Sequence, residues 1–132
     1  KLFWECHDST QGNRQGNDLG SQYRSAIFTT NPLQMELALA SKDKYQSALT
    51  EKGFKTITTE IKAGKVFYYG ESYHQQYLAK PGSRPYCSAM PTNVPLTEFK
   101  GAKYKLPKNV WDEFDWQISH CVLRSNNSPI QL

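Results

Sequence analysis

The side chains of Asp18 and Tyr23 lie five residues apart, in a glycine-rich polar stretch that leads into the first β-favouring segment. A carboxyl group and a phenol that converge on one small volume can hold a polar oxygen through two hydrogen bonds, and a phenol shielded from water can also donate a proton. The alternative is that Asp18 caps a turn while Tyr23 packs in the core. The spacing alone favours this structural alternative, so a chemical role depends on the surrounding sequence.

A second group of candidates consists of the three cysteines, Cys6, Cys87 and Cys121. Their odd number and the lack of a short Cys-x-x-Cys pair argue against a secreted disulfide framework, and favour buried thiols or redox chemistry in a reducing compartment. Cysteine and histidine are adjacent twice, as Cys6 with His7 and as His120 with Cys121. Because adjacent residues rarely ligate the same ion, we expect no metal site.

The composition limits the class of protein. A chain of 132 residues has room for one hydrophobic core. The net charge of +4 is small and scattered, so nucleic acid is not an expected partner. No stretch approaches the roughly 20 consecutive apolar residues that a bilayer helix needs, so no membrane span is expected.

The elements that must position these side chains are mixed. Residues 2–24 predict an ordered polar loop, and residues 22–29 predict a short strand. An N-cap at Asn31 followed by Pro32 predicts a helix that Gly53 ends. The apolar positions at approximately helical spacing in that helix are Leu33, Leu37, Ala40, Tyr45 and Ala48.

Beyond Gly53 the pattern changes. Residues 56–61 and 66–69 flank a turn signal and predict two strands that form a hairpin, and residues 72–80 predict a short helix. Frequent prolines follow and interrupt further elements. We therefore divide the chain into an α+β core over residues 1–80 and an irregular, proline-rich tail that wraps the core over residues 81–132.

The most specific signal is a long, ordered series of motifs: FWECHDSTQGNRQGNDLGSQYRSAIF, ITTEI, FYYGESYHQQYL and the cysteine of PYC. Over residues 2–87 this series resembles peptide methionine sulfoxide reductase A. The resemblance implies a two-layer, ferredoxin-like sandwich. It also implies reduction of the S epimer of methionine sulfoxide, free or in proteins, through a cysteine that becomes a sulfenic acid and is then resolved by other cysteines.

The resemblance assigns roles to the polar and aromatic candidates. Asp18 and Tyr23 match the family's carboxylate and tyrosine that hold the sulfoxide oxygen, or a water near it. His74 matches a histidine near the family's site, and a structural histidine bonded to the backbone is an equal alternative. Tyr69 and Tyr86 are candidates to line the aromatic pocket that holds the methyl group of the substrate.

Two cysteines match recycling roles. Cys87 matches the family's first recycling cysteine, which attacks the sulfenic acid; the alternative is an inert buried thiol. Cys121 lies 34 residues beyond Cys87. It can serve as the final recycling cysteine only if the tail folds back, and a structural thiol beside Val122 and Leu123 is the alternative. The resemblance gives Cys6 no catalytic role.

The sequence also departs from the family pattern. The family's nucleophile lies in a GCFW motif, and neither this motif nor the essential glutamate that accompanies it is present in the 132 residues. We therefore expect the chain to be the C-terminal part of a longer reductase, with an incomplete fold. The alternative is a non-catalytic truncated relative that binds oxidised-methionine peptides or a partner.

The remaining expectations concern partners and location. The family implies no bound cofactor, and thioredoxin or another dithiol as the reductant. Free thiols indicate a reducing intracellular compartment, and we expect the cytoplasm, although an organelle is compatible with the same features.

Overall fold

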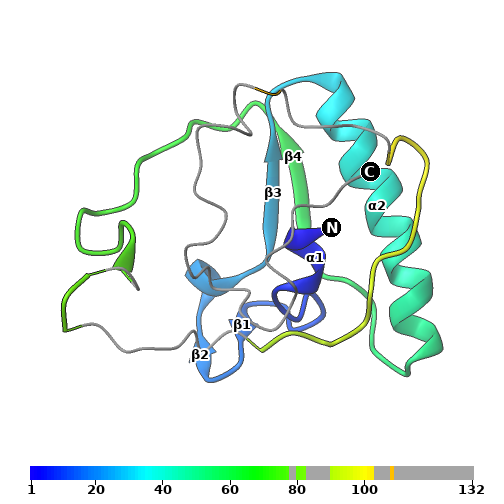
Figure 1. The fold of residues 1–132 in the computed structure, drawn as a ribbon, viewed down its shortest axis with the longest axis horizontal. Coiled ribbons are helices and arrows are strands. Elements are labelled where there is room, and N and C mark those ends of the chain that lie inside the picture. Colours follow the sequence, from blue (N-terminus) through cyan, green and yellow to red (C-terminus); the bar gives the residue numbers. More distant parts are fainter. Residues whose placement is uncertain (78–79, 83–89, 103–107, 109–132) are drawn as a thin grey trace. The chain divides into compact units, whose positions relative to one another are not determined.

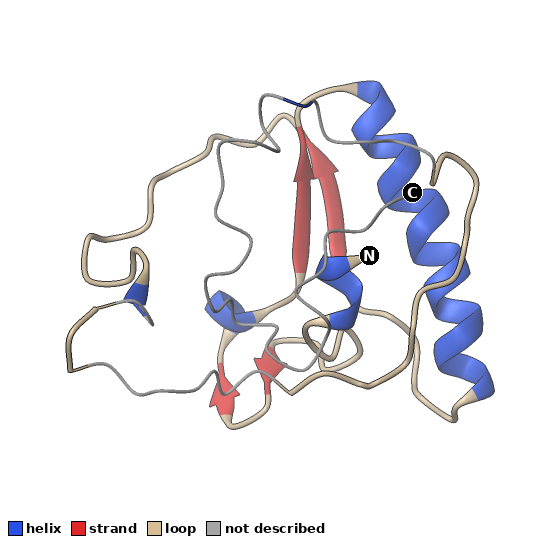
Figure 2. Cartoon of the chain, in the orientation of Figure 1, coloured by secondary structure: helices blue, strands red, loops and turns tan. Residues whose placement is uncertain are grey.

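The computed structural model describes residues 1–77, 80–82, 90–102 and 108 (Figure 1). Its contacts divide into two units, one of Lys1–Val66 with Ala89–Ala102 and one of Phe67–Ser88 with Lys103–Leu132. All helices and strands with described bounds lie in the first unit, which mixes α and β as the sequence predicts (Figure 2). No helix in the described part of the chain is long and apolar enough to cross a membrane.

The predicted long helix is α2 (Pro32–Glu51). The Asn31 side chain caps it by accepting a hydrogen bond from the backbone N–H of Gln34 at 2.9 Å. Pro32 fits the first helical position because a backbone N–H there would have no intrahelical partner. Gly53 adopts a left-handed conformation, φ +79°, just after the C-terminal end. These contacts confirm both predicted ends of the helix.

The buried face of α2 differs in part from the predicted one. Tyr45 is fully buried as expected, but Leu33 is 54% exposed. The residue that packs against α2 explains the difference. Trp4 of α1 (Leu2–Glu5) donates its indole N–H to the Ser41 hydroxyl at 2.8 Å, so the small polar side chain of Ser41 faces inward. The buried positions of the helix are Ala38, Ser41, Tyr45 and Leu49.

Two strands on either side of α2 in sequence form a parallel pair. β3 (Ala26–Thr29) and β4 (Glu60–Ala63) lie side by side, with Ala26 opposite Glu60 and Thr29 opposite Ala63 (Figure 1). Because parallel neighbours need a crossover connection, α2 supplies it and the three elements form a β-α-β unit. The predicted hairpin between residues 56–61 and 66–69 is therefore wrong. Residues 66–69 form no strand, and their side chains are 71–87% exposed.

The segment before β3 contains three short elements. β1 (Arg14–Gln15) and β2 (Asp18–Leu19) form a small antiparallel hairpin. A 3₁₀ turn, η1 (Ser21–Tyr23), follows, and β3 begins only at Ala26. The strand predicted over residues 22–29 is thus confirmed only in its second half.

Residues 72–76 form turns, and Tyr77 lies in a 3₁₀ turn, in place of the predicted helix over residues 72–80. The backbone N–H of His74 donates to the carbonyl of Glu71 at 2.8 Å. Gln76 then has φ +50°, a left-handed conformation that an α-helix does not contain. Over the described part of this segment the helix prediction is wrong.

Part of the proline-rich segment completes the core. The Tyr45 hydroxyl bonds to Thr92 Oγ1 at 2.8 Å and donates to the carbonyl of Val94 at 3.2 Å. Val94 and Leu96 are 5% and 4% exposed, and they pack in one cluster with Trp4 and Tyr45. The segment containing them runs along α2 (Figure 1). These contacts hold the segment against α1 and α2.

Candidate functional site

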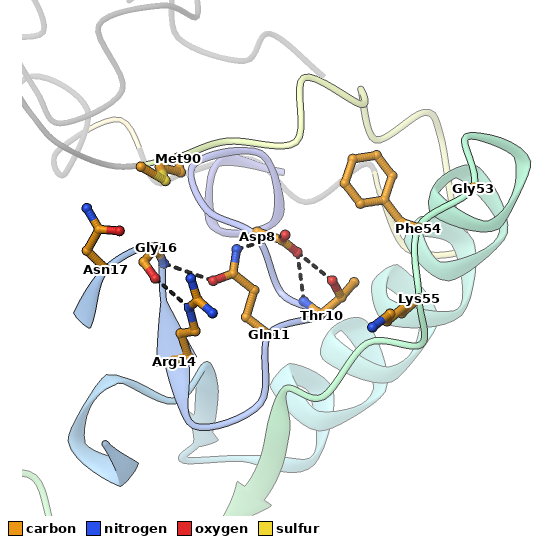
Figure 3. Close-up of a pocket in the computed structure, with 10 residues that line it drawn as sticks. All are labelled: Asp8, Thr10, Gln11, Arg14, Gly16, Asn17, Gly53, Phe54, Lys55 and Met90. Carbon is orange, nitrogen blue, oxygen red and sulfur yellow. Dashed lines mark hydrogen bonds between the residues drawn. The ribbon is translucent and has the colours of Figure 1, made fainter. Parts of the chain in front are cut away.

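A network of side-chain amides orders the loop between α1 and β1 (Figure 3). The Asp8 carboxylate accepts hydrogen bonds from the backbone N–H and hydroxyl of Thr10, at 2.9 and 2.7 Å, and from Gln11 Nε2 at 2.9 Å. Burial raises the pKa of the Asp8 carboxyl, but these hydrogen bonds outweigh burial and leave it below its ordinary value. Gln15 exchanges two hydrogen bonds with the Asp8 backbone, and Gln11 accepts one from the Gly16 N–H. The loop is ordered, as the sequence predicts.

Asp18 and Tyr23 lie at the far end of this loop. Asp18 opens β2 and is exposed, and Tyr23 closes η1 with 42% of its surface exposed. Between them, the Gly20 N–H donates to the carbonyl of Asn13 at 2.9 Å, and the Tyr23 N–H donates to the carbonyl of Gly20 at 3.1 Å. Among the described contacts, no hydrogen bond joins the carboxyl group to the phenol. The structure therefore places both groups on one short, ordered segment where solvent reaches them.

His7 ties α1 to the segment that follows Tyr23. Its Nδ1 lies 2.8 Å from the carbonyl oxygen of Phe3, which can only accept, so Nδ1 carries the proton in the neutral ring. Its Nε2 lies 2.7 Å from Ser25 Oγ, which lies 2.8 Å from Thr59 Oγ1. In this tautomer Ser25 donates to His7. Ser25 is thereby held between α1 and the residue that precedes β4.

This arrangement predicts an acid-sensitive fold. Burial lowers the pKa of His7, although the Phe3 carbonyl and the Asp8 charge act in the opposite direction. When the pKa of a histidine is lower in the folded state than in the unfolded state, the unfolded state binds the proton more tightly. The fold therefore keeps its full stability above the unfolded pKa, about 6.5, and loses stability as the pH falls below it. We expect urea midpoints to decrease between pH 7.5 and 5.5.

The histidine variants identify the group responsible. His7→Gln should show a smaller decrease over this pH range than the wild type, because no imidazole is left there to be protonated. His74→Gln, which alters an exposed residue, should follow the wild-type profile. An unchanged pH dependence in His7→Gln would exclude His7 as the cause.

A pocket of about 580 Å³ adjoins the loop (Figure 3). Asp8, Gln11 and Arg14 line it from the loop, and Phe54 and Met90 line it from segments distant in sequence. Neither Asp18 nor Tyr23 lines it. The sequence did not indicate Phe54 and Met90, since only the folded chain brings them beside the loop.

The other predicted site residues belong to the second unit. Tyr69 is 87% exposed and contacts Phe67, with ring centroids 5.3 Å apart. His74 is exposed, and its ring lies 4.5 Å from that of Tyr73. The remaining predicted site residues, Tyr86, Cys87 and Cys121, lie outside the described residues.

Cys6 has the environment of a structural thiol. Its half-buried Sγ donates to the carbonyl of Phe3 at 3.3 Å. Burial raises the pKa of the Cys6 thiol, so the reactive thiolate is disfavoured. Within the described ranges no group of three His, Cys, Asp or Glu side chains is arranged to hold a metal ion.

Comparison with known protein families identifies the family of this chain. A family model described as peptide methionine sulfoxide reductase matches residues 1–105. The chain belongs to the peptide methionine sulfoxide reductase family. This match confirms the resemblance that the motifs indicated.

Reductases of this family in several organisms are similar to the chain. The mitochondrial peptide methionine sulfoxide reductase of Rattus norvegicus is 57% identical over 94 residues, which are 71% of this chain and 40% of the relative. The Homo sapiens counterpart is 58% identical over the same shares. Peptide methionine sulfoxide reductase MsrA 1 of Synechocystis sp. is 56% identical over 94 residues, 71% of this chain and 42% of the relative. The chain thus spans about 40% of the length of these curated relatives.

The methionine sulfoxide reductase match covers most of the predicted site residues. Residues 1–105 include Asp18, Tyr23 and Cys87. Cys121 lies beyond this range. The family match therefore covers the two residues predicted to bind the oxygen and the first predicted recycling cysteine, and it does not reach the second.

Proposed function

We propose that this chain contributes to the thiol-dependent reduction of methionine S-sulfoxide, free or in proteins. The observation that carries the proposal is the family match across residues 1–105, because it contains the ordered hairpin and turn on which Asp18 and Tyr23 are exposed. An exposed pair suits a site that must admit a methionine side chain of another protein.

In this proposal Asp18 and Tyr23 bind the oxygen of the substrate. The Tyr23 phenol donates a hydrogen bond to the sulfoxide oxygen, and Asp18 binds the same oxygen or a water beside it. Negative charge grows on that oxygen when a thiolate attacks sulfur, so hydrogen bonds directed at it lower the barrier. Tyr69 and Tyr86 are proposed to contact the methyl group, and His74 to lie near the site.

The reaction balances in three steps. A thiol attacks the sulfoxide sulfur, the S=O bond breaks, and the products are methionine and a cysteine sulfenic acid. Cys87 then attacks the sulfenic sulfur, which forms a disulfide and releases the oxygen as water. An external dithiol such as thioredoxin reduces the disulfide, directly or through Cys121, and is itself oxidised. No bound cofactor is needed.

We also propose the overall architecture that the family implies. A ferredoxin-like sandwich would extend the observed β-α-β unit with further strands. Residues 1–80 would form the α+β core, and residues 81–132 the tail that carries both recycling cysteines. A dithiol reductant suits a reducing intracellular compartment, either the cytoplasm or an organelle.

A chimera tests the proposal. In the rat mitochondrial reductase, the 94 matching residues are replaced by those of this chain, so that the relative supplies the rest of the protein. We expect the chimera to reduce the S epimer of dabsyl-methionine sulfoxide with dithiothreitol and to leave the R epimer unchanged. A folded chimera that binds oxidised-methionine peptides without reducing them would instead support a non-catalytic binding module.

Cys87 should be needed for recycling but not for the first turnover. In the chimera, Cys87→Ser should release one equivalent of methionine and then stall with thioredoxin, because the thiol proposed to attack the sulfenic acid is absent. Rapid-quench measurement of methionine separates the first turnover from the steady state. Cys6→Ser is the matched control and should cycle normally. Steady cycling of Cys87→Ser at the original rate would contradict the assignment.

A further inference from the structure

Arg24, the residue after Tyr23, is bound to two different parts of the chain. Its Nη1 donates to the carbonyl of Ser21 at 2.8 Å, and its Nε donates to the Glu60 carboxylate at 2.9 Å. Ser21 is the first residue of η1, and Glu60 is the first residue of β4. One guanidinium group thus connects the turn that carries Tyr23 to the parallel strand pair.

The turn has little else to hold it. Residues 21–24 are all exposed, so none of them is anchored by burial in the core. Within the turn, the backbone contributes the Tyr23–Gly20 hydrogen bond at 3.1 Å and the Arg24–Ser21 hydrogen bond at 3.3 Å. Two backbone bonds over an exposed turn leave its conformation weakly determined. The planar guanidinium adds two directed donors at fixed geometry, which a flexible ammonium group does not.

The acceptor of the Arg24 side chain is itself fixed in place. The backbone N–H of Glu60 donates to the carbonyl of Ser25 at 3.0 Å. Its carboxylate also bonds to Lys62 Nζ at 2.6 Å, on the oxygen that Arg24 does not use. Lys62 and Arg24 together lower the pKa of Glu60 to about 2, so the carboxylate stays ionised at every pH at which the protein would work.

We propose that Arg24 and Glu60 are positioning residues that hold the η1 turn, and with it the Tyr23 phenol, in the orientation used for catalysis. The importance of Tyr23 rests on the function proposed above, but the positioning of the turn does not. The pair is partly exposed, with side-chain exposures of 42% and 22%. Its contribution to global stability should therefore be small, and its loss should change mainly the conformation of the η1 turn.

The 132-residue chain, labelled with [¹³Cζ]tyrosine, tests the positioning directly. Tyr23→Phe assigns the Tyr23 signal. Arg24→Ala should shift or broaden that signal and should accelerate hydrogen exchange at the Tyr23 and Arg24 amides about tenfold, while exchange in α2 stays unchanged. Glu60→Gln should act in the same direction.

Two further variants separate positioning from a general charge effect. Lys62→Ala removes the other partner of Glu60 and leaves both Arg24 contacts, so the Tyr23 signal should stay as in the wild type. Arg24→Lys keeps the charge, but its single ammonium group does not reproduce the two-donor geometry, so the Tyr23 signal and exchange rates should be intermediate. If Arg24→Ala leaves both readouts unchanged, or Lys62→Ala changes them equally, the proposal is overturned.

Activity in the chimera distinguishes this proposal from the proposed function. Arg24→Ala should lower kcat about tenfold and change KM little, because misplacing a group that acts in the transition state slows the chemical step. If Tyr23→Phe slows reduction and Arg24→Ala does not, the positioning role fails and the proposed function stands. If Arg24→Ala alters the Tyr23 signal but Tyr23→Phe leaves the rate unchanged, the oxygen-binding role proposed for Tyr23 fails and the turn is still held as described.

Discussion

Replacing Tyr23 by Phe and Asp18 by Asn together should lower the rate of methionine S-sulfoxide reduction by about 10²–10³-fold in the chimera. Neither substitution changes the size of the side chain much, and both residues are exposed, so the fold should survive. The loss should appear in the reductive step, because the two groups are proposed to stabilise charge on the departing oxygen. Single-turnover measurement of methionine release isolates that step from recycling.

Matched substitutions control for removing a hydroxyl or a carboxylate elsewhere. Tyr68→Phe alters a tyrosine that is 80% exposed, and Asp43→Asn alters an exposed carboxylate on α2. Both should leave the single-turnover rate within about twofold of the wild type, since surface changes away from the site have small effects. If the double variant at Asp18 and Tyr23 also keeps an undiminished rate, the oxygen-binding role is rejected.

Local signals predicted the parts of the fold that depend on a few neighbouring residues. Asn31, Pro32 and Gly53 marked the ends of α2 correctly, because capping and backbone conformation are decided within one turn. The order of the loop before β1 was also predictable. Its short polar side chains bond to nearby backbone groups, as Asp8 does with the Thr10 N–H.

Sequence patterns whose outcome depends on distant partners gave wrong predictions. Residues 56–61 favour a strand, but nothing in their composition says that β4 pairs with β3 across α2 rather than with the next segment. The inward face of α2 likewise depends on Trp4, because its indole N–H gives the buried Ser41 hydroxyl a partner, whereas the polarity of serine alone would place this position in solvent. Gln76 interrupts the predicted helix through its backbone conformation, although glutamine favours helices.

The candidate site likewise contains some residues that the sequence could identify and others that it could not. Asp18 and Tyr23 could be grouped from the sequence because the hairpin and the turn that carry them are continuous in the chain. The contact between Arg24 and Glu60 could not be predicted, since it exists only after β4 docks beside β3. The residues proposed to orient the site are therefore harder to find in the sequence than those proposed to act in it.

Trp4→Ala should destabilise the protein by about 3–5 kcal/mol, the range typical of removing a large buried aromatic side chain. Trp4 is 2% exposed, and its ring lies 5.7 Å from that of Tyr45 between centroids. The substitution leaves a cavity at the junction of α1 with α2. Because domains are stable by only about 5–15 kcal/mol, we expect a large decrease in the urea midpoint.

A double-mutant cycle separates the hydrogen bond from the packing. Trp4→Phe removes the indole N–H, Ser41→Ala removes its acceptor, and the coupling between the two should be about 1 kcal/mol. Leu33→Ala is the exposed control and should cost less than about 0.5 kcal/mol. If Trp4→Ala unfolds at nearly the wild-type urea concentration, α1 is not docked on α2 as described. His7, which follows α1, would then lose the support that lets it hold Ser25, and the turn that presents Tyr23 would depend on the Arg24 side-chain contacts and the remaining backbone hydrogen bonds.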